Sequence, residues 1–144
     1  AVRPDGSHFV AIEDFEYPNG LAFSPDESVL YVANTRESKH IQAYDVAEDG
    51  TVSNGRMWAD MSSDEPDGVP DGMKVDVEGR VYCTGPGGCW VFDSDGSHMG
   101  IVRLPEIPAN VAFGGSDHRT MLFTARSSIY TMRMTTEGTS IPTG

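Results

Sequence analysis

The fold is decided by the segment Pro18-Asn19-Gly20-Leu21-Ala22-Phe23, because it recurs further along the chain. The second copy is Pro70-Asp71-Gly72-Met73-Lys74-Val75, and the third begins at Pro108 and contains Val111-Ala112-Phe113. The three prolines stand 52 and 38 residues apart. These spacings bracket the period of about 40 to 50 residues that is typical of β-propeller blades.

Each repeat contains short runs of β-branched and aromatic residues separated by turn residues, which is the pattern of strands in an antiparallel sheet. No segment shows a sustained helical period with caps, so we expect almost no helix. The predicted strands are 21–23, 29–33, 41–44 and 52–59 in the first repeat, 73–75, 81–84, 89–92 and 98–103 in the second, and 111–113, 121–125 and 128–134 in the third. Residues 8–15 are expected to form the last strand of an incomplete blade.

The sequence therefore predicts an all-β fold of about three four-stranded blades from a six-bladed β-propeller. We expect one partial propeller domain over residues 1–144, divided into blades at 1–17 (partial), 18–69, 70–107 and 108–144 (partial). Propellers close with about four to eight blades, so three cannot close a ring. A parent with further blades upstream is favoured over a ring completed by identical chains or an open arc. Exposed blade faces would allow self-association.

Composition excludes several classes of partner. The formal charge is −12, from 22 acidic and 10 basic residues, without a basic patch for nucleic acid. No apolar stretch is long enough to cross a membrane, so we expect a soluble protein. The chain opens on a turn sequence without an initiator methionine, which indicates part of a longer protein. The compartment cannot be assigned, although a cytoplasmic one is favoured. Cys83 and Cys89 are expected to be buried thiols, with a disulfide across a hairpin as the alternative.

The loops fall into two groups when they are sorted by the end of the blade at which they lie. The turns after the first and third strand of each repeat are short and rich in Asp, Gly and Ser, as in ordinary hairpins. The segments at the other end, 17–20, 34–40, 61–72, 84–88 and 104–110, are more irregular. Irregular loops on one face of a repeat fold usually carry its function. We therefore place the candidate site at this end.

Asn19 and Asp71 are the candidate metal ligands at that end, because both follow a Pro and precede a Gly at the start of an innermost strand. An amide and a carboxylate oxygen at equivalent positions suit a hard divalent cation. We expect their oxygens to converge to about 4–5 Å, since calcium takes oxygen ligands at 2.3–2.6 Å. The alternative is that each Asx-Gly pair only shapes a turn.

These motifs, together with Phe113-Gly114-Gly115, resemble the gluconolactonase, regucalcin and luciferin-regenerating-enzyme family over essentially the whole chain. The resemblance implies a six-bladed propeller with one divalent metal in its central channel and hydrolysis of sugar lactones or related esters. It assigns metal binding to Asn19 and Asp71 and proton handling to Asp71. The family's other ligands, a Glu near the N-terminus and an Asn in an earlier blade, have no counterpart here.

The function expected from the resemblance is that of the C-terminal half of a metal-dependent lactonase, weakly active or inactive by itself. Its cofactor would be calcium, with zinc or magnesium as alternatives, and its partner a small lactone. A propeller used only for binding or as a scaffold is the alternative, because fold does not fix activity. Independently of function, we expect the apolar residues of the inner strands to be largely buried between or within blades, namely Leu21, Phe23, Val29, Tyr31, Met73, Val75, Val81, Val111, Phe113, Leu122 and Phe123.

Overall fold

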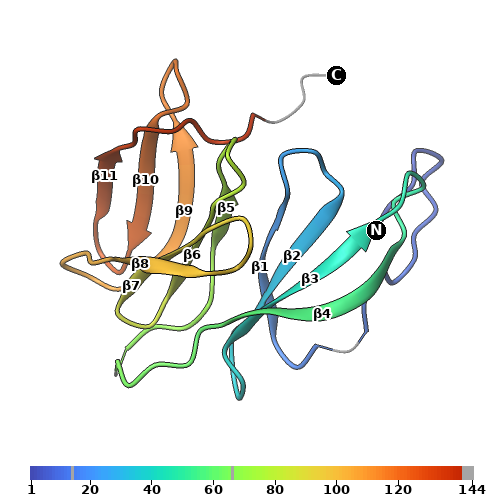
Figure 1. Cartoon of the computed structure of the whole chain (residues 1–144), viewed down its shortest axis with the longest axis horizontal. Coiled ribbons are helices and arrows are strands. Elements are labelled where there is room, and N and C mark those ends of the chain that lie inside the picture. Colours follow the sequence, from blue (N-terminus) through green and yellow to red (C-terminus); the bar gives the residue numbers. More distant parts are fainter. Residues whose placement is uncertain (14, 66, 141–144) are drawn as a thin grey trace.

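The computed structural model describes residues 1–13, 15–65 and 67–140, and it places three antiparallel sheets side by side (Figure 1). The first two sheets have four strands and the third has three, each joined in chain order. No helix occurs among the described residues. The strands are β1 (Pro18–Phe23), β2 (Val29–Asn34), β3 (His40–Val46), β4 (Val52–Asp60), β5 (Met73–Val75), β6 (Val81–Gly85), β7 (Gly88–Phe92), β8 (His98–Val102), β9 (Pro108–Gly114), β10 (Thr120–Ala125) and β11 (Ile129–Arg133).

This arrangement confirms the prediction of an all-β partial propeller. The first strand of each sheet contacts the first strand of the next, β1 with β5 and β5 with β9, so these three strands are innermost. Hairpin turns connect the strands, and Gly50, Gly79 and Gly96 in three of them have positive φ, the conformation that glycine adopts at little steric cost. No helix long and apolar enough to cross a membrane is found in the part of the chain that the structure describes.

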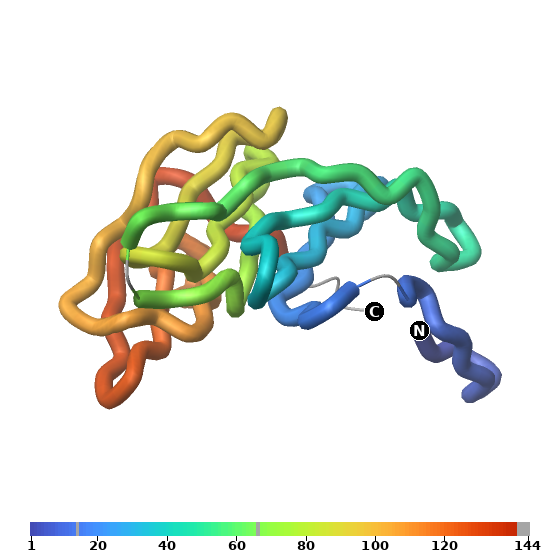
Figure 2. The backbone as a smooth tube through the Cα atoms, turned by 90° about the horizontal axis from the view of Figure 1, so that it is seen from below, coloured from blue at the N-terminus to red at the C-terminus, as the bar shows by residue number. Residues whose placement is uncertain are grey.

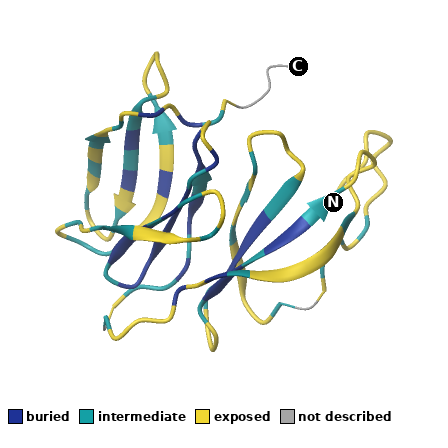
Figure 3. Ribbon diagram, viewed as in Figure 1, coloured by how far each residue is buried: buried dark blue, intermediate teal, exposed yellow. Residues whose placement is uncertain are grey.

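The hydrophobic core lies between the sheets. Between the first and second sheets, Tyr31 and Ile41 pack with Met73 and Phe92 in one buried cluster. Between the second and third, Tyr82 packs with Val111 and Phe123 in another. Figure 3 shows the buried residues concentrated on these facing strands, while β1, β4 and β11 expose much of their surface. Each sheet is thus stabilised mainly through its neighbours, as expected for repeated blades.

The prediction that all apolar residues of the inner strands are buried is wrong for Leu21 and Phe23, which are 57% and 43% exposed. Successive side chains of a strand point to opposite faces, and Ala22 between them faces the core cluster. Leu21 and Phe23 therefore lie on the opposite face of the first sheet, which no further sheet among the described residues covers. Val29, Phe113 and Leu122 are only half-buried, whereas the remaining residues of the prediction are buried.

The N-terminal segment does not form the predicted strand over 8–15. Among its described residues only an isolated bridge joins Val2 and His8. The ring of Phe15 packs instead against His40 and Tyr44, at 6.4 and 6.2 Å between ring centroids. Residues 1–13 project beyond the first sheet, at the end of the molecule away from the third (Figure 2).

Cys83 and Cys89 are free, buried thiols, so the disulfide alternative is wrong and the expectation of structural thiols is confirmed. The register pairs Cys83 with Trp90 and Cys89 with Thr84. Cys83 belongs to the core cluster facing the first sheet and Cys89 to the cluster facing the third. The two sulfur atoms thus lie on opposite faces of one sheet. Burial raises the pKa of Cys83 to about 12, so its thiol stays protonated.

The chain after β11 returns along the turn end of the second sheet and is fastened there. Thr139 N donates to Val75 O at 3.1 Å, and Val77 N donates to Glu137 O at 3.0 Å. The fully buried Asp76 carboxylate holds this region together: it accepts hydrogen bonds from Tyr82 and from Arg80, whose guanidinium also donates to Thr136. The C-terminal segment therefore links the third sheet to the second.

Candidate functional site

The candidate site lies where the three innermost strands begin, and we call this part of the molecule the rim: Asn19-Gly20, Asp71-Gly72 and Ala109-Asn110. In β1 the pairing with β2 slips between Pro18 and Leu21, and in β9 the pairing with β10 slips between Pro108 and Asn110. Such bulges commonly redirect side chains next to functional sites. In the second sheet, Thr84 bonds to both residues of the pair, accepting from Asp71 N and donating to Gly72 O. The rim thus breaks the regular ladder at equivalent positions.

Glycines bring the strands of the rim unusually close together. A Cβ atom on Gly20 would lie 1.8 Å from Asp71 O, and one on Gly72 would lie 2.1 Å from Asn110 Oδ1. Real Cβ atoms essentially never come this close to another heavy atom, and a Cβ on Gly72 would also lie 2.6 Å from the Asn110 Cα, so any side chain would push the strands apart. The glycine after each Asx position is therefore required for contact with the next blade. This is a physical reason for the repeated Asx-Gly pair beyond turn formation.

Two threonines tie the blades together just behind the rim. Thr35 Oγ1 donates to Pro70 O at 2.8 Å, which fixes the residue before Asp71. Thr84 Oγ1 lies 3.3 Å from Ala109 O in the following blade, and Gly72 N donates to that same oxygen at 3.0 Å. Thr35 follows β2 and Thr84 lies in β6, so both stand near the C-terminal end of the second strand of their sheet. Hydrogen bonds between blades make the rim a rigid support.

Asn19 and Asp71, which the sequence predicts as ligands, lie near each other on the rim. Partial burial raises the pKa of Asp71, and a side-chain hydrogen bond from Asn19 opposes that rise. Asn19 itself is exposed and Asp71 is half-buried, so the pair is open to solvent on one side. The interaction with Asn19 thus offsets only part of the free-energy cost of burying the Asp71 charge.

The pair fits a hard divalent cation in its chemistry. An amide that donates to the carboxylate can present its oxygen instead when a cation binds, because the two ends of the amide have nearly the same shape. Carboxylate and amide oxygens are the ligand types that calcium prefers, and Asp71 loses the cost of its buried charge when a cation is beside it. Among the described residues no group of three His, Cys, Asp or Glu side chains is placed to hold a metal. Water would have to supply further ligands here.

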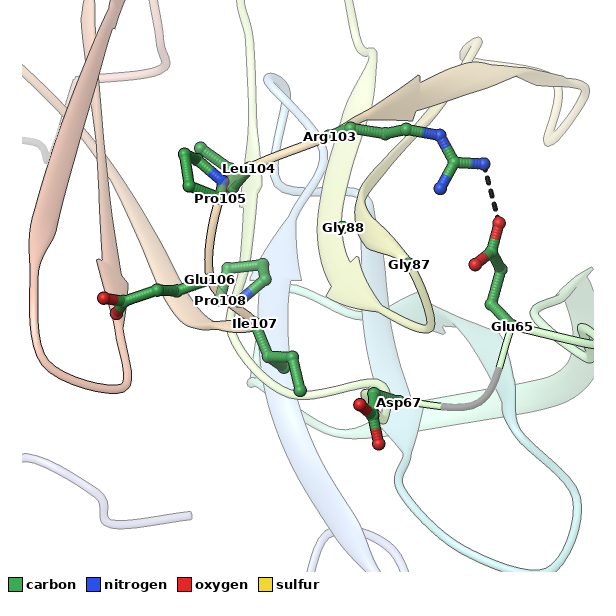
Figure 4. A pocket seen from close by; sticks show the side chains of 10 residues that line it. All are labelled: Glu65, Asp67, Gly87, Gly88, Arg103, Leu104, Pro105, Glu106, Ile107 and Pro108. Carbon is green, nitrogen blue, oxygen red and sulfur yellow. Dashed lines mark hydrogen bonds and ion pairs between the residues drawn. The ribbon is translucent and has the colours of Figure 1, made fainter.

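A separate hollow lies between the second and third sheets, beside the rim, and Figure 4 shows its lining. Arg103 reaches across it to Glu65, with 2.7 Å between Nη2 and Oε1. Glu106 points away from it and accepts hydrogen bonds from Ser127 and Ser128. Neither Asn19 nor Asp71 lines the hollow. Three of its charged groups, Arg103, Glu65 and Glu106, are engaged within the protein, and neither candidate ligand lines it, so the rim remains the candidate site.

Sequence reasoning missed Asn110 on the rim and the two threonines behind it, Thr35 and Thr84. A weak signal for the threonines is their place near the end of a second strand: Thr35 directly follows β2, and Thr84 lies one residue before the end of β6. Asn110 was hidden because the third repeat has Ala109 at the position of Asn19 and Asp71. Its place on the rim follows from packing against Gly72.

Known proteins similar to the chain include a gluconolactonase from Zymomonas mobilis, 31% identical over 143 residues, which cover 95% of this chain and 40% of that protein. The solved structure of a gluconolactonase from Xanthomonas campestris is 37% identical, with a TM-score of 0.78 over 91% of this chain and 42% of that one. A calcium-binding regucalcin from Agrobacterium tumefaciens, 21% identical, shares the fold with a TM-score of 0.78, covering 94% of this chain and 51% of its own.

The chain thus spans about two fifths to half of the length of these relatives. The family model described as the SMP-30/gluconolactonase/LRE-like region matches residues 1–127. It includes both rim positions at which the sequence predicts metal ligands. The chain belongs to the SMP-30/gluconolactonase/LRE-like family.

Proposed function

We propose that this chain carries part of the active site of a metal-dependent lactonase, in which Asn19 and Asp71 bind a divalent cation and Asp71 handles protons. The observation that carries the proposal is that Asn19 and Asp71 lie near each other on the rim of a chain whose relatives include gluconolactonases. The preferred cation is calcium, with zinc and magnesium as alternatives. The substrate class is sugar lactones.

In the proposed hydrolysis, Asp71 has two roles: it binds the cation and it transfers a proton. When bound, a divalent cation supplies polarisation of the lactone carbonyl. The Asp71 carboxylate orients a water molecule and accepts its proton as the oxygen adds to the carbonyl carbon. The ring C–O bond then breaks, and the proton passes to the departing ring oxygen to give an open hydroxy acid.

Calorimetric titration of the chain with calcium, zinc and magnesium tests the cation site. Asp71→Asn should weaken calcium binding by at least about tenfold, because the amide has no charge. Asp95→Asn is the matched control: it changes a carboxylate in an exposed turn and should leave the affinity unchanged. Hydrolysis of D-glucono-1,5-lactone, followed by acid release, should fall in parallel with calcium affinity. Equal affinity of the chain and Asp71→Asn would contradict the site and favour a propeller that only binds or supports partners.

A further inference from the structure

We propose that Asn110 is a substrate-binding residue of the same site, whose side-chain amide donates a hydrogen bond to a ring hydroxyl of a polyhydroxylated lactone. The inference rests on the proposed function and deepens it, because it explains how such a site distinguishes a sugar lactone from a plain cyclic ester. It is carried by the position of Asn110, by the fixed orientation of its amide and by the bulge that displays it.

The position of Asn110 is next to the proposed cation ligand. Its Cα and Oδ1 lie against Gly72, where a Cβ atom would be only 2.6 and 2.1 Å away. Gly72 directly follows Asp71, and the hydrogen bond from Gly72 N to Ala109 O holds the two strands together at this point. Asn110 therefore continues the line formed by Asn19 and Asp71 along the rim. A lactone whose carbonyl lies at Asp71 would extend its ring carbons toward a neighbouring position on that line.

The amide of Asn110 is oriented by its own backbone. Val111 N donates to Asn110 Oδ1 at 2.8 Å, which occupies the oxygen and leaves the Nδ2 group as the free end. Over residues 1–13, 15–65 and 67–140, no hydrogen bond from this Nδ2 group to the protein is formed, and the residue is exposed. The free end can therefore donate to a ligand without first breaking a bond to the protein.

A β-bulge in the backbone beside Asn110 also sets the direction of its side chain. The register of β9 slips between Pro108 and Asn110, so Ala109 is an extra residue and the alternation of side chains is reset. Asn110 pairs with Thr124 and is followed by the buried Val111. The buried Val111 and the pairing with Thr124 together fix the position of the Asn110 Cα atom. An amide held in this way can bind a ligand more specifically than a mobile amide on the surface can.

The test compares Asn110→Ala and Asn110→Ser with the matched control Thr124→Ala, which removes a polar side chain from the neighbouring strand. Two probe lactones are used in calcium buffer: D-glucono-1,5-lactone, which carries ring hydroxyls, and δ-valerolactone, which carries none. Asn110→Ala should raise KM for the hydroxylated lactone by about tenfold and leave KM for δ-valerolactone and the affinity for calcium unchanged. Thr124→Ala should change none of the three. In ¹⁵N-labelled chain, the Asn110 side-chain resonances should shift on titration with D-gluconate.

The outcomes separate the two proposals. Unchanged KM for D-glucono-1,5-lactone in Asn110→Ala, with hydrolysis by the unsubstituted chain intact, would overturn the role of Asn110 alone. An equal rise for both lactones, or a loss of calcium binding in Asn110→Ala, would show that Asn110 supports the rim and recognises no hydroxyl. If the unsubstituted chain binds neither calcium nor D-gluconate, the proposed function falls and this inference with it. Urea unfolding of each variant identifies any loss of folding.

Discussion

The two ends of the propeller segment use the same residue type in opposite ways. At the turn end, aspartates accept hydrogen bonds from close neighbours: Ser24 and Ser28 lower the pKa of Asp26 to about 2, and Arg133 lowers that of Asp117. At the rim, burial raises the pKa of Asp71, and Asn19 opposes this only in part. A carboxylate at the turn end is therefore stabilised as a charge by the fold. The charge of Asp71 would instead be stabilised by a bound cation.

This contrast arises from the backbone around each residue. Hairpin turns place donors two residues away, as in Ser28 N to Asp26 Oδ1 at 3.2 Å and Thr51 N to Asp49 Oδ1 at 3.0 Å. The rim consists of bulged strand starts, where the free backbone groups bond between blades instead. The hydrogen bonds of a turn aspartate are thus formed within a few residues of the chain. The hydrogen bonds of the rim form only where the three blades meet.

The largest effect is expected from removing Asp76, the one fully buried carboxylate among the described residues, at the turn end. Asp76→Ala removes the acceptor for Glu78 N, Arg80 and Tyr82 and should lower the free energy of unfolding by about 3–5 kcal/mol. Urea unfolding measures the loss, and hydrogen exchange should show faster exchange of the Val77 and Thr139 amides, which pair with the C-terminal segment and with Val75. Asp95→Ala, in an exposed turn, is the control with a much smaller loss. Equal losses would show that Asp76 does not hold this end together.

A smaller effect is expected from loosening the support of the rim. Thr35→Val removes the hydroxyl that donates to Pro70 O and should cost about 1–2 kcal/mol of stability. Calcium affinity should fall a few-fold, because the backbone before Asp71 is less fixed. Thr35→Ser keeps the hydroxyl and should retain the affinity. The rim would not depend on this bond if Thr35→Val bound calcium as well as the unsubstituted chain does.

The smallest effects, of opposite sign, are expected from removing one charge at each end in calcium-free buffer. Because the pKa of Asp71 is raised on folding, its cost is absent at low pH and appears as the pH rises and the group ionises. Asp71→Asn should therefore be more stable than the unsubstituted chain at pH 7, with the difference vanishing near pH 3.

For Asp26 the folded pKa is lowered, so its stabilisation is present above the unfolded value of 3.8 and is lost as the pH falls through about 2. Asp26→Asn should therefore be less stable than the unsubstituted chain at pH 7, with the difference shrinking toward pH 2. Urea unfolding between pH 2 and pH 7 measures both variants. Changes of the same sign at pH 7 would remove the distinction between the two ends.

The open face of the first sheet shows where sequence reasoning about burial stops. The alternation of Leu21, Ala22 and Phe23 predicts a strand, and β1 covers all three residues. Alternation also means that the two faces need two different neighbours. Only the Ala22 side meets another sheet among the described residues, so Leu21 and Phe23 stay largely exposed. Which face of a blade is covered depends on the arrangement of blades, which a strand pattern does not contain.

The sequence by itself determined the repeat, the strands and the two Asx-Gly positions, because these follow from local patterns: alternation, turn residues and a period near blade length. The tertiary structure alone decided that Thr35 and Thr84 bond to the following blade and that Asn110 joins the rim. These contacts join residues from different blades. Their geometry depends on how closely glycine lets the inner strands approach, and no single repeat encodes that distance.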